Sequence, residues 1–208
     1  MGEAEPAVDT RTAIIEAARL RLLDDGHNGL STRKVAETAG VPLSQLHYHF
    51  GSKQGVLLAV LEHENQRRLE RQSRMYSAER PVWERYEQAC DFLEDDLDSG
   101  FVRVLQEMMA EGWANEEIAA AVRRQLIGWY ELMADVAEEA EARYGPLGPF
   151  TAREVATLIG NAFIGSESLI LLGFDRDDLP IRSALRRIGV LIRHVEEQSA
   201  KGADDARP

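Results

Sequence analysis

The amino-acid sequence predicts an all-α protein: a three-helix N-terminal domain joined by a long helix to a larger helical domain. Apolar residues recur at helical spacing along most of the 208 residues, and breaks rich in Gly or Pro divide the chain into about nine such segments. No segment alternates convincingly as a strand would. We therefore expect one domain over residues 9–55, a second over 56–198 and a disordered polar tail over 199–208.

The first predicted helix runs from Thr12 to Asp25 and ends at Gly26, with apolar residues on one face. A long helix is predicted to begin after Ser52, a plausible N-cap, and to become charged over 62–74. Further helices are predicted over Val82–Leu97, Phe101–Trp113, Asn115 to about Tyr144, Thr151–Leu172 and from Ile181 onward. The Thr151-x-x-Glu154 pattern is typical of a capping box.

The segment Ser31–Lys53 predicts two short helices around a tight turn. Gly40 can supply the turn, since left-handed backbone costs glycine little, and Pro42 suits the first position of the second helix. Polar residues of the second helix lie between its apolar anchors and can face outward, which is the layout of a helix-turn-helix motif. The apolar anchors are Val35, Ala36 and Ala39 in the first short helix and Leu43, Leu46 and Phe50 in the second.

This segment resembles the DNA-binding domain of the TetR family of transcriptional repressors. The chain has His47 where the family usually has Tyr, and the resemblance covers only the N-terminal quarter. It implies an operator-binding domain followed by a divergent ligand-binding and dimerisation domain. The matching residues are Thr32, Val35-Ala36, Ala39-Gly40-Val41, Leu46-His47-Tyr48-His49-Phe50 (resembling Leu-Tyr-x-His-Phe) and Ser52-Lys53.

Side-chain chemistry assigns expected DNA contacts within this segment. Hydrogen-bonding and apolar groups on the second helix suit base edges, and groups at helix starts or beyond the second helix suit phosphates. Alternatively His49 and Phe50 belong to the core and Lys53 is a plain surface lysine; for Phe50 we accept the core position. The expected base contacts are Arg33, Pro42, Leu43, Ser44, Gln45 and His47, and the expected phosphate contacts are Thr32, Tyr48, His49 and Lys53.

Charge and composition constrain the function. The net charge of −12 comes entirely from residues beyond 74, and the first 74 residues are neutral overall, which removes most of the objection to a DNA partner. The acidic N-terminus has no apolar signal segment, Cys90 is alone, and apolar runs such as 168–173 are too short to span a bilayer, so we expect a cytoplasmic protein without membrane contact.

Catalytic and metal-binding patterns are not found in the sequence. His63-Glu64 lacks the second His of a zinc-binding helix, the other histidines have no ligand spacing with Cys90, and no glycine-rich phosphate loop occurs. We therefore expect no enzyme activity, no metal and no cofactor.

Aromatic and Met residues in the middle helices suit an apolar cavity for a small-molecule effector. The alternative is an ordinary helical core. The candidate cavity residues are Trp83, Tyr86, Cys90, Phe101, Met108, Met109, Trp113, Trp129, Met133, Phe163 and Glu167.

The last two long helices are the expected homodimer interface. Small residues four apart on the first of these helices would allow another helix to approach closely. The final helix carries an apolar stripe that can lie alongside. The alternative is that both stripes face the core of one protomer. The candidate interface residues are Ala152, Ala156, Gly160, Ile181, Leu185, Ile188, Ile192 and Val195.

Together these features predict a homodimeric transcriptional regulator, a repressor released from a palindromic double-stranded DNA operator by a small molecule. The alternative is a small-molecule-binding helical protein whose DNA-reading domain is weak or vestigial. The sequence identifies neither the effector nor the operator.

Overall fold

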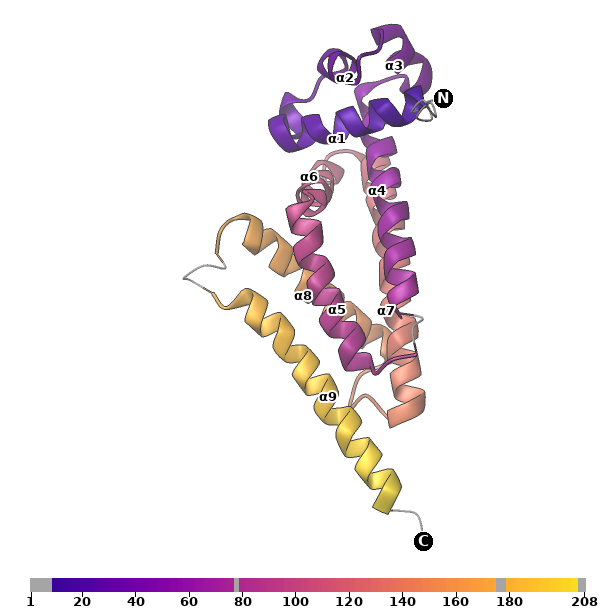
Figure 1. Ribbon diagram of the computed structural model, residues 1–208, viewed down its shortest axis with the longest axis vertical. Helices are drawn as coiled ribbons and strands as arrows, with labels where there is room; N and C mark the ends of the chain where they lie inside the picture. The colour runs from indigo at the N-terminus through magenta and orange to yellow at the C-terminus, as the bar shows by residue number, and fades with distance from the viewer. Residues whose placement is uncertain (1–8, 77–78, 175–178, 206–208) are drawn as a thin grey trace, which may run out of the picture. The chain divides into compact units, whose positions relative to one another are not determined.

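The computed structural model describes residues 9–76, 79–174 and 179–205, with residues 27 and 201–205 described by their backbone alone. These ranges contain nine α-helices and no strand, which confirms the all-α prediction (Figure 1). The helices are α1 (Thr10–Gly29), α2 (Thr32–Ala39), α3 (Leu43–Phe50), α4 (Lys53–Tyr76), α5 (Val82–Asp98), α6 (Phe101–Gly112), α7 (Glu116–Tyr144), α8 (Ala152–Leu171) and α9 (Ile181–Asp205).

The chain divides into two compact units. The first contains residues up to Arg67 together with Arg103–Arg123, and the second contains Arg68–Val102 and the chain from Arg124 onward. The helices α4, α6 and α7 therefore each contribute residues to both units. Because compactness divides the chain inside α4, the expected functional boundary between residues 55 and 56 stays a prediction.

In the first unit, α1, α2 and α3 pack against one another (Figure 1). Ile14, Val35, Leu46 and Val60 are completely buried and supply its apolar core. Helix α1 was expected to end at Gly26. It instead kinks there, because Gly26 has a φ of 68°, and continues for one more turn to Gly29.

The turn between α2 and α3 is the one that the sequence predicts. Gly40 has φ 67° and ψ 28°, the left-handed conformation, and its N–H donates to the carbonyl of Glu37 (3.2 Å). The side chain of Ser31 caps the start of α2 by accepting from the N–H of Lys34 (3.3 Å). Helix α3 begins at Leu43, one residue later than expected, because Pro42 has an extended ψ of 141°.

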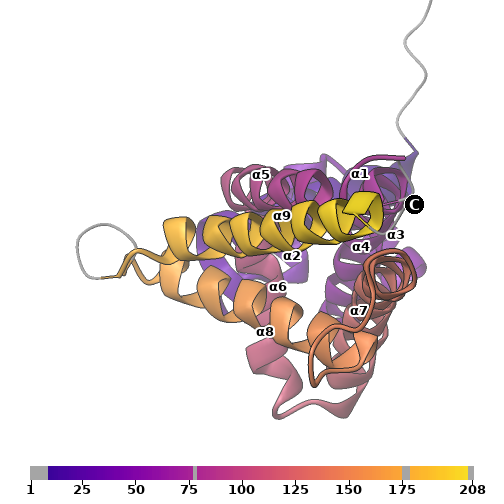
Figure 2. The same cartoon turned by 90° about the horizontal axis from the view of Figure 1, so that it is seen from below.

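In the second unit, α9 packs against α5 and α8 (Figure 2). The predicted capping box is present at the start of α8, where Thr151 and Glu154 satisfy each other's backbone N–H groups. Helix α9 continues to Asp205, so residues 199–205 are helical where the sequence predicted a disordered tail. The Ser199 hydroxyl helps to fix this end by donating to the carbonyl of Tyr144 (3.2 Å). Residues 206–208 lie outside the described residues.

Helix α8 is long and apolar enough, by length and composition, to cross a membrane. It has 20 residues and a mean hydropathy of 1.2, whereas the sequence analysis had considered only shorter uninterrupted apolar runs. Core helices of soluble proteins meet the same criterion, and the inner face of α8 packs within the second unit.

The first turn of α4 depends on a glycine. A Cβ atom at Gly55 would overlap the backbone carbonyl oxygen of Phe50, whereas Gly165, also helical, has open space at its Cβ position. We expect Gly55→Ala to lower the free energy of unfolding by about 1–3 kcal/mol through overpacking. Gly165→Ala should raise it by about 0.4–1 kcal/mol, since alanine favours helix.

Urea unfolding of both variants, followed by circular dichroism, measures this difference. Equal or higher stability of Gly55→Ala would show that the start of α4 relaxes without cost.

Candidate nucleic-acid interface and ligand cavity

Helix α3 is anchored on one side and open on the other. Leu46 is completely buried, and the side chains of Pro42, Leu43, Ser44, Gln45 and His47 are exposed. The structure therefore brings together the expected base-contacting residues of α3 on one accessible surface. Hydroxyl, amide, imidazole and apolar groups side by side form a set that can read base edges in a major groove.

The expected phosphate contacts surround this surface. Tyr48 is 83% exposed, and its ring lies edge-on to that of His49, with the centroids 5.2 Å apart. Thr32 lies in the first turn of α2 and Lys53 in that of α4, both half-buried. Free backbone N–H groups at helix starts attract phosphate, which makes these positions suitable.

Phe50 and His49 are both half-buried, and their ring centroids lie 6.0 Å apart. Phe50 is half-buried, and the guanidinium of Arg11 lies over its ring at 5.5 Å from the centroid. Its packing fits the core position that we expected. His49 is also half-buried, so it combines an anchoring position with an accessible edge.

His47, the position that departs from the family pattern, has a defined orientation. Its Nδ1 lies 3.0 Å from the carbonyl oxygen of Gly51. Since a carbonyl oxygen only accepts, Nδ1 carries the hydrogen in this contact. A neutral ring in this tautomer offers Nε2 as an acceptor.

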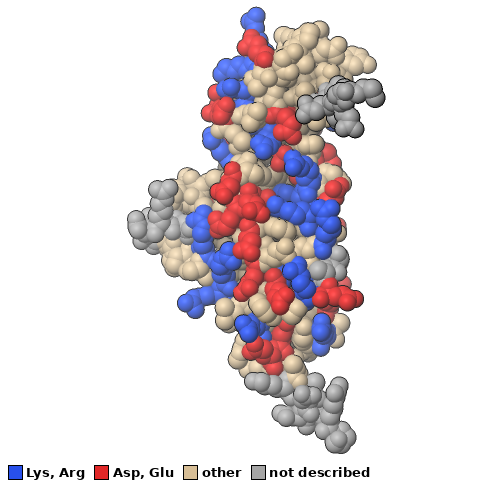
Figure 3. Space-filling view, in the orientation of Figure 1, with Lys and Arg blue, Asp and Glu red and all other residues tan. Residues whose placement is uncertain are grey.

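On the face shown in Figure 3, the described charged side chains do not form one continuous basic stripe. Lys and Arg are interspersed with Asp and Glu on the face shown in Figure 3. Arg33, an expected base contact, is exposed and lies 3.7 Å from Glu37 on the same helix. Such an exposed pair contributes little stability, so breaking it to free the Arg33 guanidinium for another contact costs little free energy.

The second unit encloses a cavity of about 170 Å³ lined mainly by apolar side chains. Three of the expected residues line it: Tyr86, Met133 and Phe163. Trp129 and Glu167 line a much smaller neighbouring cavity, which Phe163 also contacts. The rings of Tyr86 and Trp129 both meet Phe163 edge-on, with centroids 5.8 and 6.2 Å away.

Six expected cavity residues line neither of these two cavities: Trp83, Cys90, Phe101, Met108, Met109 and Trp113. Met108, Met109 and Trp113 belong to the first unit, where Trp113 is 87% exposed. Phe101 is covered by the guanidinium of Arg68 at 4.1 Å, and the ring of Trp83 by that of Arg193 at 4.8 Å.

Cys90, the sixth, is buried in the core, where burial raises the pKa of its thiol to about 11. A thiol with so high a pKa is almost entirely protonated at neutral pH and reacts slowly.

Sequence reasoning missed two charged residues of the cavity wall. Arg85 is 1% exposed and forms a bidentate ion pair with Glu139, both distances being 2.8 Å, and it also donates to the carbonyl of Tyr76 (2.6 Å). This hydrogen bonding lowers the pKa of the Glu139 carboxyl. The buried Glu196 accepts from the backbone N–H groups of Val82 (2.8 Å) and Trp83 (3.3 Å). The charged groups in the wall therefore already have partners.

The expected interface stripes face the interior of the protomer, which was the alternative considered. Ala152, Ala156, Gly160, Ile181 and Leu185 are buried within the second unit, so they cannot form a surface between protomers. A Cβ atom at Gly160 would overlap the Tyr130 ring, which explains the small residue there.

The remaining interface candidates are Ile188, Ile192 and Val195. Ile192 and Val195 line the cavity, and Ile188 is half-exposed. Other apolar or small residues of α8, its C-cap and α9 are exposed or half-exposed, at helical spacings of three, four or seven: Leu158, Gly165, Leu172, Ala184, Ile188 and Leu191. We call this set the open apolar face.

The short helices α2 and α3, joined by a tight turn and with the outer face of α3 exposed, have the layout of a helix-turn-helix DNA-binding motif. Residues 14–60 match the sequence model described as "Bacterial regulatory proteins, tetR family". The N-terminal part of the chain thus matches the DNA-binding domain of TetR-family regulators, as the resemblance in the sequence implied.

Relatives extend the match beyond the first domain. The chain is 25% identical over 147 residues to the HTH-type transcriptional regulator UidR of Escherichia coli K12, covering 71% of this chain and 72% of that protein.

Two solved structures share the fold. A TetR-family transcriptional regulator from Rhodococcus sp. has a TM-score of 0.73 and 22% identity, covering 88% of this chain and 97% of that one. A transcriptional regulator from Saccharomonospora viridis in complex with choline has the same TM-score and identity, covering 86% and 94%.

Proposed function

We propose that this protein is a homodimeric cytoplasmic repressor that binds a palindromic operator through α3 and is released by a small apolar ligand. It acts by binding and not by catalysis. The observation that carries the proposal is the exposed face of α3, where five groups suited to base edges stand opposite the completely buried Leu46.

In this proposal, α3 lies in the major groove and its N-terminal residues contact the bases. The amide of Gln45 can pair bidentately with adenine, Ser44 can bond several bases, and Pro42 and Leu43 can contact thymine methyl groups. His47 offers Nε2 as an acceptor, which suits the exocyclic amino group of cytosine or adenine. Arg33 reaches a guanine edge or a phosphate after leaving Glu37.

The phosphate contacts position this surface on the duplex. Thr32 and Lys53 act at the starts of α2 and α4, and Tyr48 and His49 act beyond the other end of the base-reading residues. The interspersed charges of the chain predict modest nonspecific affinity, so sequence-dependent contacts must provide much of the operator preference.

Two observations support the dimer in this proposal: the small size of the recognition surface and the open apolar face of α8 and α9. One short helix reads few base pairs, and two-fold symmetry would place two copies about 34–36 Å apart in successive major grooves. The open face combines the small residues Gly165 and Ala184 with Leu158, Leu172 and Leu191. Exposed apolar patches of this kind typify interaction sites.

The cavity of the second unit supports a ligand-responsive role. Its volume of about 170 Å³ matches a ligand about the size of an aromatic ring, since an apolar cavity of about 150 Å³ holds benzene. A solved protein of this fold from Saccharomonospora viridis is in complex with choline, a cation. In this chain the one carboxylate among the cavity's lining residues, that of Glu196, already accepts two backbone N–H groups, so a cation would have only aromatic rings to contact, and the mainly apolar wall favours an uncharged apolar ligand.

The vestigial alternative is tested by replacing base-contacting and phosphate-contacting residues separately. Gln45→Ala should weaken binding to the preferred DNA by about 5- to 150-fold, as expected for losing one bidentate base contact worth about 1–3 kcal/mol. Tyr48→Phe should weaken binding to all duplexes alike, because a phosphate contact carries no sequence information. Gln66→Ala, an exposed residue of α4, is the matched control.

Fluorescence anisotropy at physiological salt, with duplexes selected by the wild-type chain from a random pool, measures these affinities. Failure of the wild-type chain to prefer any sequence would exclude the repressor. An unchanged Gln45→Ala affinity would exclude the base contact alone.

The dimer is tested by placing a charge on the open apolar face. Leu191 is 67% exposed in the protomer, so Leu191→Glu should fold normally but dissociate the dimer, because a carboxylate is costly inside an apolar interface. Ile127→Glu, at a residue of α7 that is 54% exposed, is the control. Light scattering after size exclusion gives the mass of each. A monomeric wild-type protein at micromolar concentration would contradict the proposal.

The ligand class is tested by thermal melting with two small probes. Toluene at about ten times its Kd should raise the Tm by about 3–5 °C, and choline should not. Ala156→Phe, which fills the cavity from its wall, should melt cooperatively but lose the toluene shift. A shift with choline alone would mean that the wall accepts a cation.

A further inference from the structure

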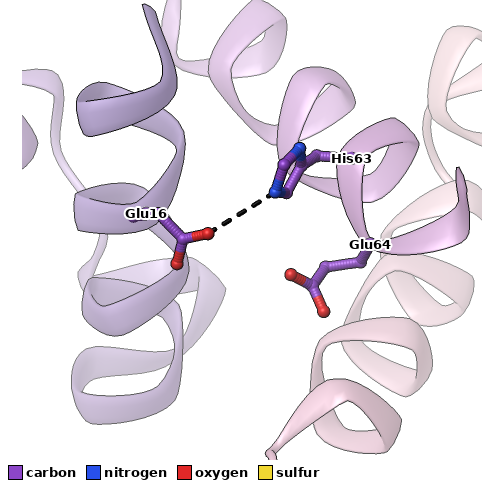
Figure 4. A group of neighbouring side chains, drawn as sticks. All are labelled: Glu16, His63 and Glu64. Carbon is purple, nitrogen blue, oxygen red and sulfur yellow. Dashed lines mark ion pairs between the residues drawn. The ribbon is translucent and has the colours of Figure 1, made fainter. Parts of the chain in front are cut away.

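A cluster of metal-ligating side chains lies in the first unit, outside the DNA-contacting surface and the cavity. Glu16 projects from α1, and His63 and Glu64 project from α4, toward one another (Figure 4). The Nε2 atom of His63 lies 3.5 Å from Oε1 of Glu16, and one ligand atom from each of the three residues lies within 4.8 Å of the others. We propose that this cluster binds a first-row divalent cation, with Zn²⁺ as its best-fitting occupant.

The distances suit such an ion with little rearrangement. Bonds of about 2.0–2.2 Å in a tetrahedron place neighbouring ligand atoms about 3.3–3.6 Å apart. Glu16 and His63 already have this separation. A shift of the Glu64 carboxylate by about an ångström, through rotation of its side chain, would complete a three-ligand site. Water would take the fourth position.

Charge and burial point to a cation as well. Glu64 is 8% exposed, and its Oε1 has no hydrogen-bond partner within the described part of the chain. It does form an ion pair with Arg19, whose Nε lies 3.3 Å away. A carboxylate has about four lone-pair sites, so Glu64 can keep this pair and still bind a metal. With the imidazole neutral, its metal-binding form, two carboxylates face one guanidinium and negative charge remains.

The ligand types select the class of ion. One imidazole with two carboxylates suits Zn²⁺ and similar transition metals, whereas Ca²⁺ needs six to eight oxygen ligands. Local sequence patterns miss the site because its third ligand comes from another helix.

A bound ion would join α1 to α4 within the first unit. Helix α1 packs on both helices of the DNA-reading motif, and α4 begins directly after it. The consequence for operator binding rests on the proposed function, whereas metal binding itself does not.

The test is metal content and thermal stability of the full chain. Dialysis against micromolar ZnCl₂ should leave about one equivalent of zinc per chain by mass spectrometry, and zinc at about a hundred times its Kd should raise the Tm by about 5–10 °C. His63→Ala and Glu16→Gln should each lose both effects, and His194→Ala, at an exposed histidine of α9, should keep them.

Glu16 is half-exposed, so Glu16→Gln remains informative if His63→Ala folds poorly. No stoichiometric zinc, or zinc retained in both cluster variants, would overturn the proposal and leave an ion-pair cluster between α1 and α4. Operator binding by the zinc-free protein, measured alongside in the presence of EDTA, separates this outcome from failure of the repressor.

Discussion

The buried carboxylate of Asp96 fixes the second half of α4, the helix that begins directly after α3 and whose last turn, at Tyr76, lines the cavity. Asp96 is 5% exposed and pairs with two arginines of α4, Arg68 at 3.0 Å and Arg71 at 2.6 Å. The two ion pairs compensate for the desolvation of the carboxylate, and each guanidinium also covers an aromatic ring, Phe101 for Arg68 and Phe92 for Arg71. Removing Asp96 would leave two partly buried cations without this anion, which makes the contact costly to break.

The first half of α4 is held differently. Val56, Leu57 and Val60 are almost completely buried in the core of the first unit, where apolar area and not charge stabilises the helix. One continuous helix is thus attached at its two ends by two independent sets of contacts. Tyr76, in the last turn, both lines the cavity and accepts a hydrogen bond from Arg85. A change in the cavity wall therefore acts directly on the end of α4.

The sequence predicted the local structure of the DNA-reading segment well, because local chemistry determines it. The left-handed turn at Gly40, and likewise the capping box at Thr151 further along the chain, each depend on residues within a few positions. The faces of α8 could not be assigned in this way. The spacing of Ala152, Ala156 and Gly160 places them on one face, but it does not say whether a neighbouring helix of the same protomer covers that face. Here Tyr130 and Met133 of α7 do so at Gly160.

The same reason applies to the expected cavity residues that line neither cavity. Met and aromatic residues of α6 are as apolar as those of α7 and α8, but most of α6 belongs to the first unit. Apolar character predicts burial without naming the core in which a side chain is buried. Arg85 and Glu196 show the opposite case, since charged residues that lie in an apolar wall are revealed only by the partners that satisfy them.

In the proposed mechanism, a ligand of one aromatic ring has enough binding free energy to release the protein from its operator. Lowering operator affinity a hundredfold requires the ligand to favour the released state by about 2.7 kcal/mol. Small ligands gain at most about 1.5 kcal/mol per non-hydrogen atom, so a ring with seven such atoms has an upper limit of about 10 kcal/mol. The binding free energy of the ligand must therefore differ between the two states by about a quarter of that upper limit. In the proposed mechanism, contacts near Tyr76 and Arg85 are well placed to provide this difference, because Tyr76 belongs to the last turn of α4 and Arg85 donates to its carbonyl. A ligand contact of equal strength in both states would add affinity without changing operator binding.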